Sequence, residues 1–191
     1  MKIRLSFLLC VIVAVLIFTH SYLSLVALLA AALHELGHIL AAKLCNIPLK
    51  ELKLGIFGAS LTPQSSLCSY KKEIILCAAG PFVNLLSAAL LLPFLTELNS
   101  FAEFFTASSL FLGILNLLPI YDLDGGRILN CMLCEKLSPE GAEKICKKLS
   151  FCIVTSMWLI SVYLLLRVSS SLSLFIFSSA LFCKIFVHRK N

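Results

Sequence analysis

Long apolar stretches alternate with short polar segments along most of the chain. No formal charge occurs between Arg4 and Glu35, and a single helix over those residues would be about 45 Å long, more than the roughly 30 Å core of a bilayer. The polar segment 20–22 divides this stretch into two helices, and the segment 167–171 divides the last stretch in the same way. The pattern predicts six membrane spans, at about 4–19, 22–44, 74–96, 104–120, 149–166 and 170–187.

Composition supports a membrane protein and excludes several other classes of protein. Of the 191 residues, 60% are apolar and 14% are charged, against roughly 45–50% and roughly 25% in soluble domains. The mean hydropathy is +0.99. These values exclude a soluble globular protein, a disordered chain and a nucleic-acid binder, so the expected partner is the lipid bilayer. We therefore predict an all-α membrane protein with a single polytopic domain over residues 1–191.

The basic residues indicate how the spans are oriented. With the N-terminus in the cytoplasm, six spans place 15 of the 16 Lys and Arg residues on one side and Arg167 alone on the other. Cytoplasmic loops of membrane proteins carry such an excess of positive charge. The first apolar segment is not followed by a small-residue cleavage site, so we expect a retained span and not a signal peptide. The pattern predicts a multi-pass protein of the cell membrane with both termini in the cytoplasm.

Two of the inner loops contain patterns of their own. Residues 49–61 alternate partly between apolar and polar side chains and include Gly55 and Gly58, which predicts a short β-hairpin or edge strand after the second span. In the other loop, Ser138 and Pro139 have the residue types of an N-cap and a first helical position. The charged, amphipathic residues that follow predict a helix at the membrane surface over about 139–148.

Two histidines and a glutamate lie within the second predicted span, where ionisable groups are costly and therefore indicate function. His34 and His38 are four residues apart and share one face of a helix, so both imidazoles can bind one metal ion. Glu35 lies beside them and has the position of a general base. Zn²⁺ suits these ligands, and a catalytic zinc site needs three protein ligands and one open position.

The third ligand must come from another part of the chain. His20 and His188 lie at the ends of predicted spans, which favours a place at the membrane interface over a role as ligands. Asp122 and Asp124 follow the fourth span on the cytoplasmic side, where the second span also ends. The two glycines after Asp124 allow this segment to turn and approach closely, although spacing alone does not distinguish the two carboxylates.

Three motifs, in this order, resemble those of the site-2 protease family of intramembrane zinc metalloproteases. They are HELGH in the second span, AGPFVN in the third and NLLPIYDLDGG after the fourth, and they cover about residues 30–130, the expected catalytic core. The C-terminal helix pair, about 149–187, lies outside them. One position departs from the pattern, because residue 122 is Asp where the family commonly has Pro. The order of spans is most similar to the subgroup of stage IV sporulation protein FB, which processes a membrane-associated sigma-factor precursor.

The resemblance implies a role for each of five residues. His34 and His38 correspond to zinc ligands of the family, and Glu35 corresponds to the residue that activates water. Asp124, in the LDG sequence, corresponds to the third zinc ligand. Asn116 corresponds to an Asn that the family uses near the substrate or the oxyanion.

The resemblance also implies a function and leaves two alternatives open. The implied function is an intramembrane zinc endopeptidase that cleaves a membrane-embedded or membrane-associated protein, such as a transcription-factor precursor, under the control of membrane regulatory proteins. One alternative is a membrane zinc protease for soluble or lipidated substrates, which would bring a Glu from another helix as its third ligand. The other alternative is a non-proteolytic zinc transporter, which would need several carboxylates along a path through the membrane.

Overall fold

The computed structural model describes most of the chain between the second and the last predicted span. The described residues are 2–5, 22–47, 49–55, 58–63, 69–94, 100–168, 175–176 and 178–183. The predicted first span, about 4–19, lies outside them except for its first two residues, which belong to a strand. Of the predicted last span, about 170–187, the described part is helical.

Helices make up most of the described chain, as the sequence predicts. They are α2 (Tyr22–Leu44), α3 (Tyr70–Leu91, continued by the 3-10 turn η1, Leu92–Phe94), α4 (Ser100–Asn116), α5 (Asp124–Cys134) and α6 (Pro139–Val168). The predicted span 22–44 coincides with α2. The helices α3 and α4 each begin four residues before the predicted spans at 74–96 and 104–120.

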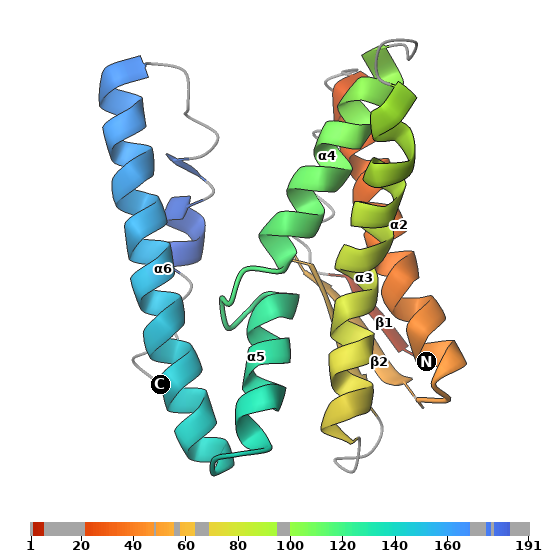
Figure 1. Cartoon of the computed structure of the whole chain (residues 1–191), viewed down its shortest axis with the longest axis vertical. Helices are drawn as coiled ribbons and strands as arrows, with labels where there is room; N and C mark the ends of the chain where they lie inside the picture. The colour runs from red at the N-terminus through yellow and green to blue at the C-terminus, as the bar shows by residue number, and fades with distance from the viewer. Residues whose placement is uncertain are drawn as a thin grey trace.

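The helices α2, α3 and α4 pack against one another as a bundle, and α5 lies between this bundle and α6 (Figure 1). Apolar residues join α2 and α3 near the C-terminal end of α2, where Ala41, Ala42 and Ile47 pack on Leu76. At the end of α2 the backbone of Asn46 is left-handed, with φ of 50°, a conformation that Asn often adopts after a helix. This end of α2 is thereby fixed against the start of α3.

Three of the described helices are long and apolar enough to cross a bilayer, namely Leu25–Leu44 in α2, Tyr70–Leu91 in α3 and Pro139–Arg167 in α6. Their outer faces are apolar and exposed: in α2, Leu36 is 58% exposed and Leu40 is 55% exposed. A helix that turns large apolar side chains outward fits a lipid environment and not water. The chain is therefore a membrane protein.

Three short strands, all within the described part of the chain, form one sheet with the order β1-β2-β3. They are β1 (Lys2–Leu5), β2 (Leu49–Gly55) and β3 (Gly58–Pro63). β2 and β3 run antiparallel, with Gly55 paired with Gly58, while β1 pairs with β2 in parallel. The central strand is therefore β2, and β3 forms one edge of this sheet.

The helix predicted at the membrane surface is not a separate element. It begins as expected, because Ser138 accepts a hydrogen bond through Oγ from the backbone N–H of Gly141 at 3.3 Å. It then continues without a break into the predicted span 149–166, so α6 is one helix of 30 residues. The reason is that the charged segment and the apolar segment meet with no Gly or Pro between them, and the backbone hydrogen bonds simply continue.

Candidate metal centre

α2 carries His34 and His38 one turn apart, and both side chains are buried, at 4% exposure each. They face α3 at a point where the two helices come very close. A Cβ on Gly37 would lie 2.8 Å from the carbonyl oxygen of Ala79, so only glycine permits this approach. Small residues allow membrane helices to pack in this way. The histidine face of α2 is therefore enclosed by α3.

α3 also fixes the orientation of one imidazole ring. The Nδ1 of His38 lies 2.7 Å from the backbone carbonyl oxygen of Leu76. Because a carbonyl can only accept, the proton of the neutral ring must be on Nδ1, and Nε2 presents a lone pair. This is the ring state that a metal ligand requires.

Gly80 provides the space in which the two imidazole rings meet. A Cβ at this position would overlap the His38 ring at Nε2 and would lie 2.9 Å from Cε1 of His34. Any side chain would therefore displace the rings from each other. Gly80 belongs to the AGPFVN sequence, and its contact with both histidines gives a physical reason for glycine there.

The segment after α4 brings Asp124 to the histidines. α4 ends at Asn116, and the chain turns back so that Asp124 becomes the first residue of α5. A Cβ on Gly125 would overlap the backbone carbonyl of Leu117, and a Cβ on Gly126 would overlap that of Ile120. The close approach predicted for these two glycines is thus confirmed.

Apolar packing against α6 anchors the same segment. Ile120 and Leu123 are buried in a cluster with Val154 of α6 and Leu181 of the C-terminal helical residues. The backbone N–H of residue 121 also donates to the Oγ of Ser150 on α6, at 2.7 Å. α6 therefore contributes to the site indirectly, because it holds the segment that carries the carboxylate.

An ion pair holds α5 against α3 from the other side. Arg127 of α5 donates through a guanidinium nitrogen to Glu73 of α3, at 3.2 Å, and both side chains are partly shielded from solvent. Arg127 lies one helical turn after Asp124, so the pair limits rotation of the turn that carries the carboxylate. Sequence reasoning did not identify this pair, because the two residues are far apart in the chain.

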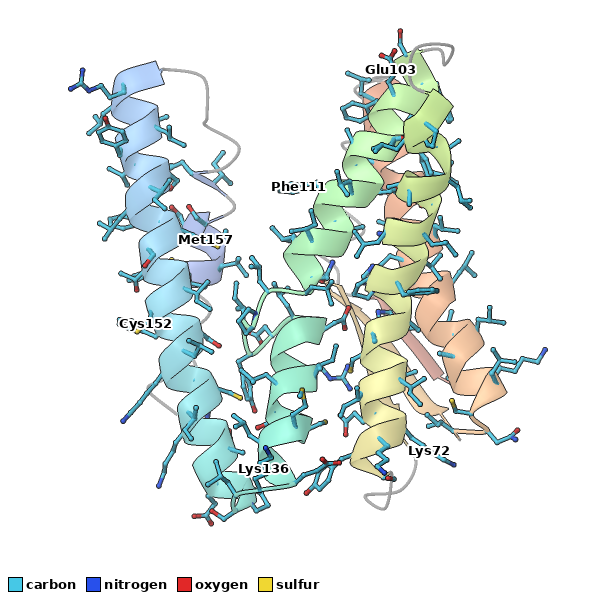
Figure 2. The ribbon with its side chains drawn as sticks, in the orientation of Figure 1. Lys72, Glu103, Phe111, Lys136, Cys152 and Met157 are labelled. Carbon is cyan, nitrogen blue, oxygen red and sulfur yellow. The ribbon has the colours of Figure 1, made fainter. Side chains whose placement is uncertain are left out.

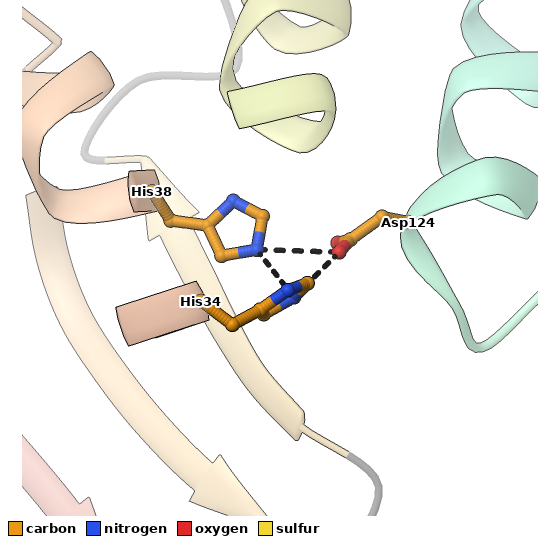
Figure 3. A group of neighbouring side chains, drawn as sticks. All are labelled: His34, His38 and Asp124. Carbon is orange, nitrogen blue, oxygen red and sulfur yellow. Dashed lines mark hydrogen bonds and ion pairs between the residues drawn. The ribbon is translucent and has the colours of Figure 1, made fainter. Parts of the chain in front are cut away.

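His34, His38 and Asp124 converge on one point (Figure 3). The Oδ2 atom of Asp124 lies 3.1 Å from Nε2 of His34 and 3.2 Å from Nε2 of His38, and the two nitrogens are 3.2 Å apart. Ligands about 2.0–2.1 Å from a tetrahedral zinc ion lie about 3.4 Å from one another. Among the residues that the structure describes, this is the one group of three such ligands that could hold a metal ion.

The chemistry of these three donors fits a zinc ion. Two imidazole nitrogens and a carboxylate oxygen are ligands that zinc commonly has in catalytic sites. All three residues are buried, and buried lone pairs that face one another are stabilised by a cation between them. Glu35 is half buried in the same helix turn, beside the histidines.

The structure also shows where Asn116 lies. It is buried at the last turn of α4, and its amide nitrogen donates to the carbonyl oxygen of Leu112 at 3.0 Å. This bond lies within its own helix, so the predicted role of Asn116 near the substrate stays a prediction. Asn84 of the AGPFVN sequence, which the family resemblance placed near the active site, does reach it: the amide of Asn84 lies 3.4 Å from Nδ1 of His34.

The chain is similar to two curated proteins over much of its length. It is 30% identical to stage IV sporulation protein FB of Bacillus subtilis over 149 residues, which is 75% of this chain and 52% of that protein. It is 28% identical to a zinc metalloprotease of Methanocaldococcus jannaschii over 158 residues, which is 79% of this chain and 46% of that protein. The chain therefore spans about half the length of the curated relatives that it matches.

A solved structure and a family model match the chain as well. The fold superimposes on the site-2 protease from Methanocaldococcus jannaschii with a TM-score of 0.69 at 25% sequence identity, and the match covers 96% of this chain and 88% of that structure. The model of peptidase family M50 matches residues 22–100 and 95–157, which include every residue of the candidate metal centre. The chain belongs to peptidase family M50.

Proposed function

We propose that this chain is an intramembrane zinc metalloprotease. The observation that carries the proposal is the buried group of His34, His38 and Asp124. Both histidines, with Glu35 beside them, lie in a helix long enough to span the membrane. From His34 to Lys43 at the end of α2 the helix rises about 14 Å. The chemistry would therefore take place below the cytoplasmic surface, within reach of a substrate that enters from the bilayer.

Each residue of the centre has a distinct part in the proposed reaction. His34, His38 and Asp124 would hold a zinc ion, which would supply Lewis-acid chemistry by polarising a carbonyl and lowering the pKa of water. Glu35 takes the proton from the attacking water and transfers it to the nitrogen of the leaving amine. Asn116, at the end of α4, is proposed to orient the substrate carbonyl. The peptide bond between the polarised carbonyl and that nitrogen is the bond that breaks.

The substrate must present an extended backbone to this centre. A transmembrane helix hides its carbonyl groups in its own hydrogen bonds, so the segment to be cleaved has to unwind first. Among the described strands β3 lies at an edge of the sheet, and an unwound segment can add to such an edge as a further strand. We propose a membrane-embedded or membrane-associated protein as the substrate, with a transcription-factor precursor as one example, and membrane proteins as regulators.

Removing the metal tests this function. Purified protein in lipid vesicles is incubated with a panel of membrane-tethered regulator proteins, and cleavage is scored by a shift on a gel. A zinc chelator is expected to abolish cleavage, and added Zn²⁺ is expected to restore it, because the metal supplies the Lewis acid. Cleavage that persists in the chelator, or a panel that stays intact with zinc present, would contradict the proposal.

We also propose six spans with both termini in the cytoplasm. In Figure 2 Lys72 and Lys136 lie at one end of the molecule and Glu103 lies at the opposite end, which supports the orientation inferred from the basic residues. Reporter fusions after Lys72 and after Lys148 are expected to be cytoplasmic, and a fusion near residue 99 is expected to be external. A reporter at the C-terminus that is external would reduce the count to five spans.

A further inference from the structure

We infer that Asn84 is a positioning residue for the metal centre. Its amide oxygen accepts a hydrogen bond from the Nδ1–H of His34 and so keeps the Nε2 lone pair of that ring directed at the metal. This inference rests on the proposed zinc site and extends it to α3. With this contact, α3 would hold both histidines, His38 through Leu76 and His34 through Asn84.

The surroundings of Asn84 support this role. Its side chain is fully buried, at 0% exposure, in the middle of α3. Its amide group faces Nδ1 of His34 at 3.4 Å. The amide oxygen, in contrast, is buried with no hydrogen-bond partner among the described residues. A buried amide with one unsatisfied oxygen is costly, so its arrangement calls for a physical explanation.

The requirements of a zinc ligand decide which amide atom faces the ring. If the amide nitrogen donated to Nδ1, the proton of the neutral ring would be on Nε2, and His34 could not bind zinc through that atom. Nε2 is the atom that converges with Nε2 of His38 and with Asp124. A half-turn of the amide exchanges its oxygen and nitrogen without changing its shape. The oxygen then accepts from Nδ1–H of His34, and the amide nitrogen takes the position that the oxygen had.

The two histidines would then be held in the same way. Leu76 accepts from Nδ1 of His38 through its backbone carbonyl, at 2.7 Å. Asn84 lies two helical turns further along α3 and accepts from Nδ1 of His34. Hydrogen bonds of this kind fix the tautomer and the orientation of metal-bound imidazoles. One contact uses the backbone and cannot be removed by substitution, but the other depends on a side chain and can be tested.

The test measures zinc affinity, by competition with a chelator, in the unmodified 191-residue chain and in two variants of residue 84. Asn84→Leu keeps the size of the side chain but removes the acceptor, and loss of such a partner typically weakens metal binding about 10–100-fold. Asn84→Asp keeps an oxygen that accepts from Nδ1–H and is expected to recover most of that loss. The matched control is Asn130→Leu, the same replacement on α5 at a residue outside the metal group, which is expected to bind zinc like the wild type.

The outcomes separate this inference from the proposed function. Wild-type affinity in Asn84→Leu, or an equal loss of affinity in Asn84→Leu and Asn84→Asp, would overturn the role of Asn84 while leaving the zinc site intact. If the wild type binds no zinc, or binds it equally well after His34→Ala, the proposed function itself fails. Where Asn84→Leu does not fold, Asn84→Asp decides: a loss of zinc affinity as large as about 10–100-fold in this variant would overturn the inference, because the variant keeps the acceptor oxygen.

Discussion

Replacing Glu35 by Gln is expected to abolish cleavage and to leave zinc binding intact. The two side chains have nearly the same shape, but an amide cannot take a proton from water. General acid–base catalysis contributes about 100- to 10,000-fold to a rate, so the loss of the base brings cleavage close to background. The proposed zinc ligands, His34, His38 and Asp124, are unchanged in this variant. Metal analysis and cleavage of a membrane-tethered substrate by the same purified preparation measure both quantities.

The control for this experiment is the pair of ligand variants. His34→Ala and His38→Ala are expected to lose both bound zinc and cleavage. Glu35→Gln is expected to lose cleavage alone and to keep its zinc. Cleavage at a near wild-type rate by Glu35→Gln would show that another group is the base. Loss of zinc in Glu35→Gln would instead make Glu35 a ligand and would exclude the assignment made from the HELGH sequence.

The features that sequence reasoning predicted well depend on local spacing. The limits of α2 follow from the polar segment at 20–22 and from the charge at Lys43, which mark the ends of an apolar run. The shared face of His34 and His38 follows from the geometry of one helix turn. The turn before α5 was indicated by two glycines whose close backbone contacts the structure then shows.

The features that it did not predict depend on contacts between distant residues. The bond from His38 to the carbonyl of Leu76 has no sequence signal, because every residue has a backbone carbonyl. The ion pair of Glu73 and Arg127 joins two ordinary charged residues from different helices. The continuity of α6 was missed for another reason: the change from charged to apolar residues was taken for the end of a helix, whereas it marks a change of environment along one helix.

The identity of the third ligand gives the second large effect. Asp124→Asn is expected to lose bound zinc and cleavage together, because the Oδ2 atom of Asp124 lies 3.1 Å and 3.2 Å from the two imidazole nitrogens. An amide oxygen carries no full charge and binds zinc weakly in a site that needs an anionic ligand. Asp124 is also buried, at 7% exposure, so water cannot readily replace the lost carboxylate.

Asp122→Asn is the matched variant, two residues earlier in the same turn. Asp122 is half buried. Burial raises the pKa of the neighbouring Tyr121 above its usual value, and the negative charges of Glu143 and Asp122 raise this pKa further. Asp122→Asn is therefore expected to keep its zinc and to lose at most about 10–100-fold in cleavage, the range for residues that support a ligand.

Measuring zinc content and cleavage in both variants distinguishes the two carboxylates, which sequence spacing alone could not separate. The structure favours Asp124 because α5 begins at that residue and the glycines that follow it contact the backbone of the preceding turn. That contact fixes the direction in which the first residue of the helix points. If Asp122→Asn lost the metal and Asp124→Asn kept it, the turn would have to rotate away from this arrangement, and the ligand assignment would be reversed.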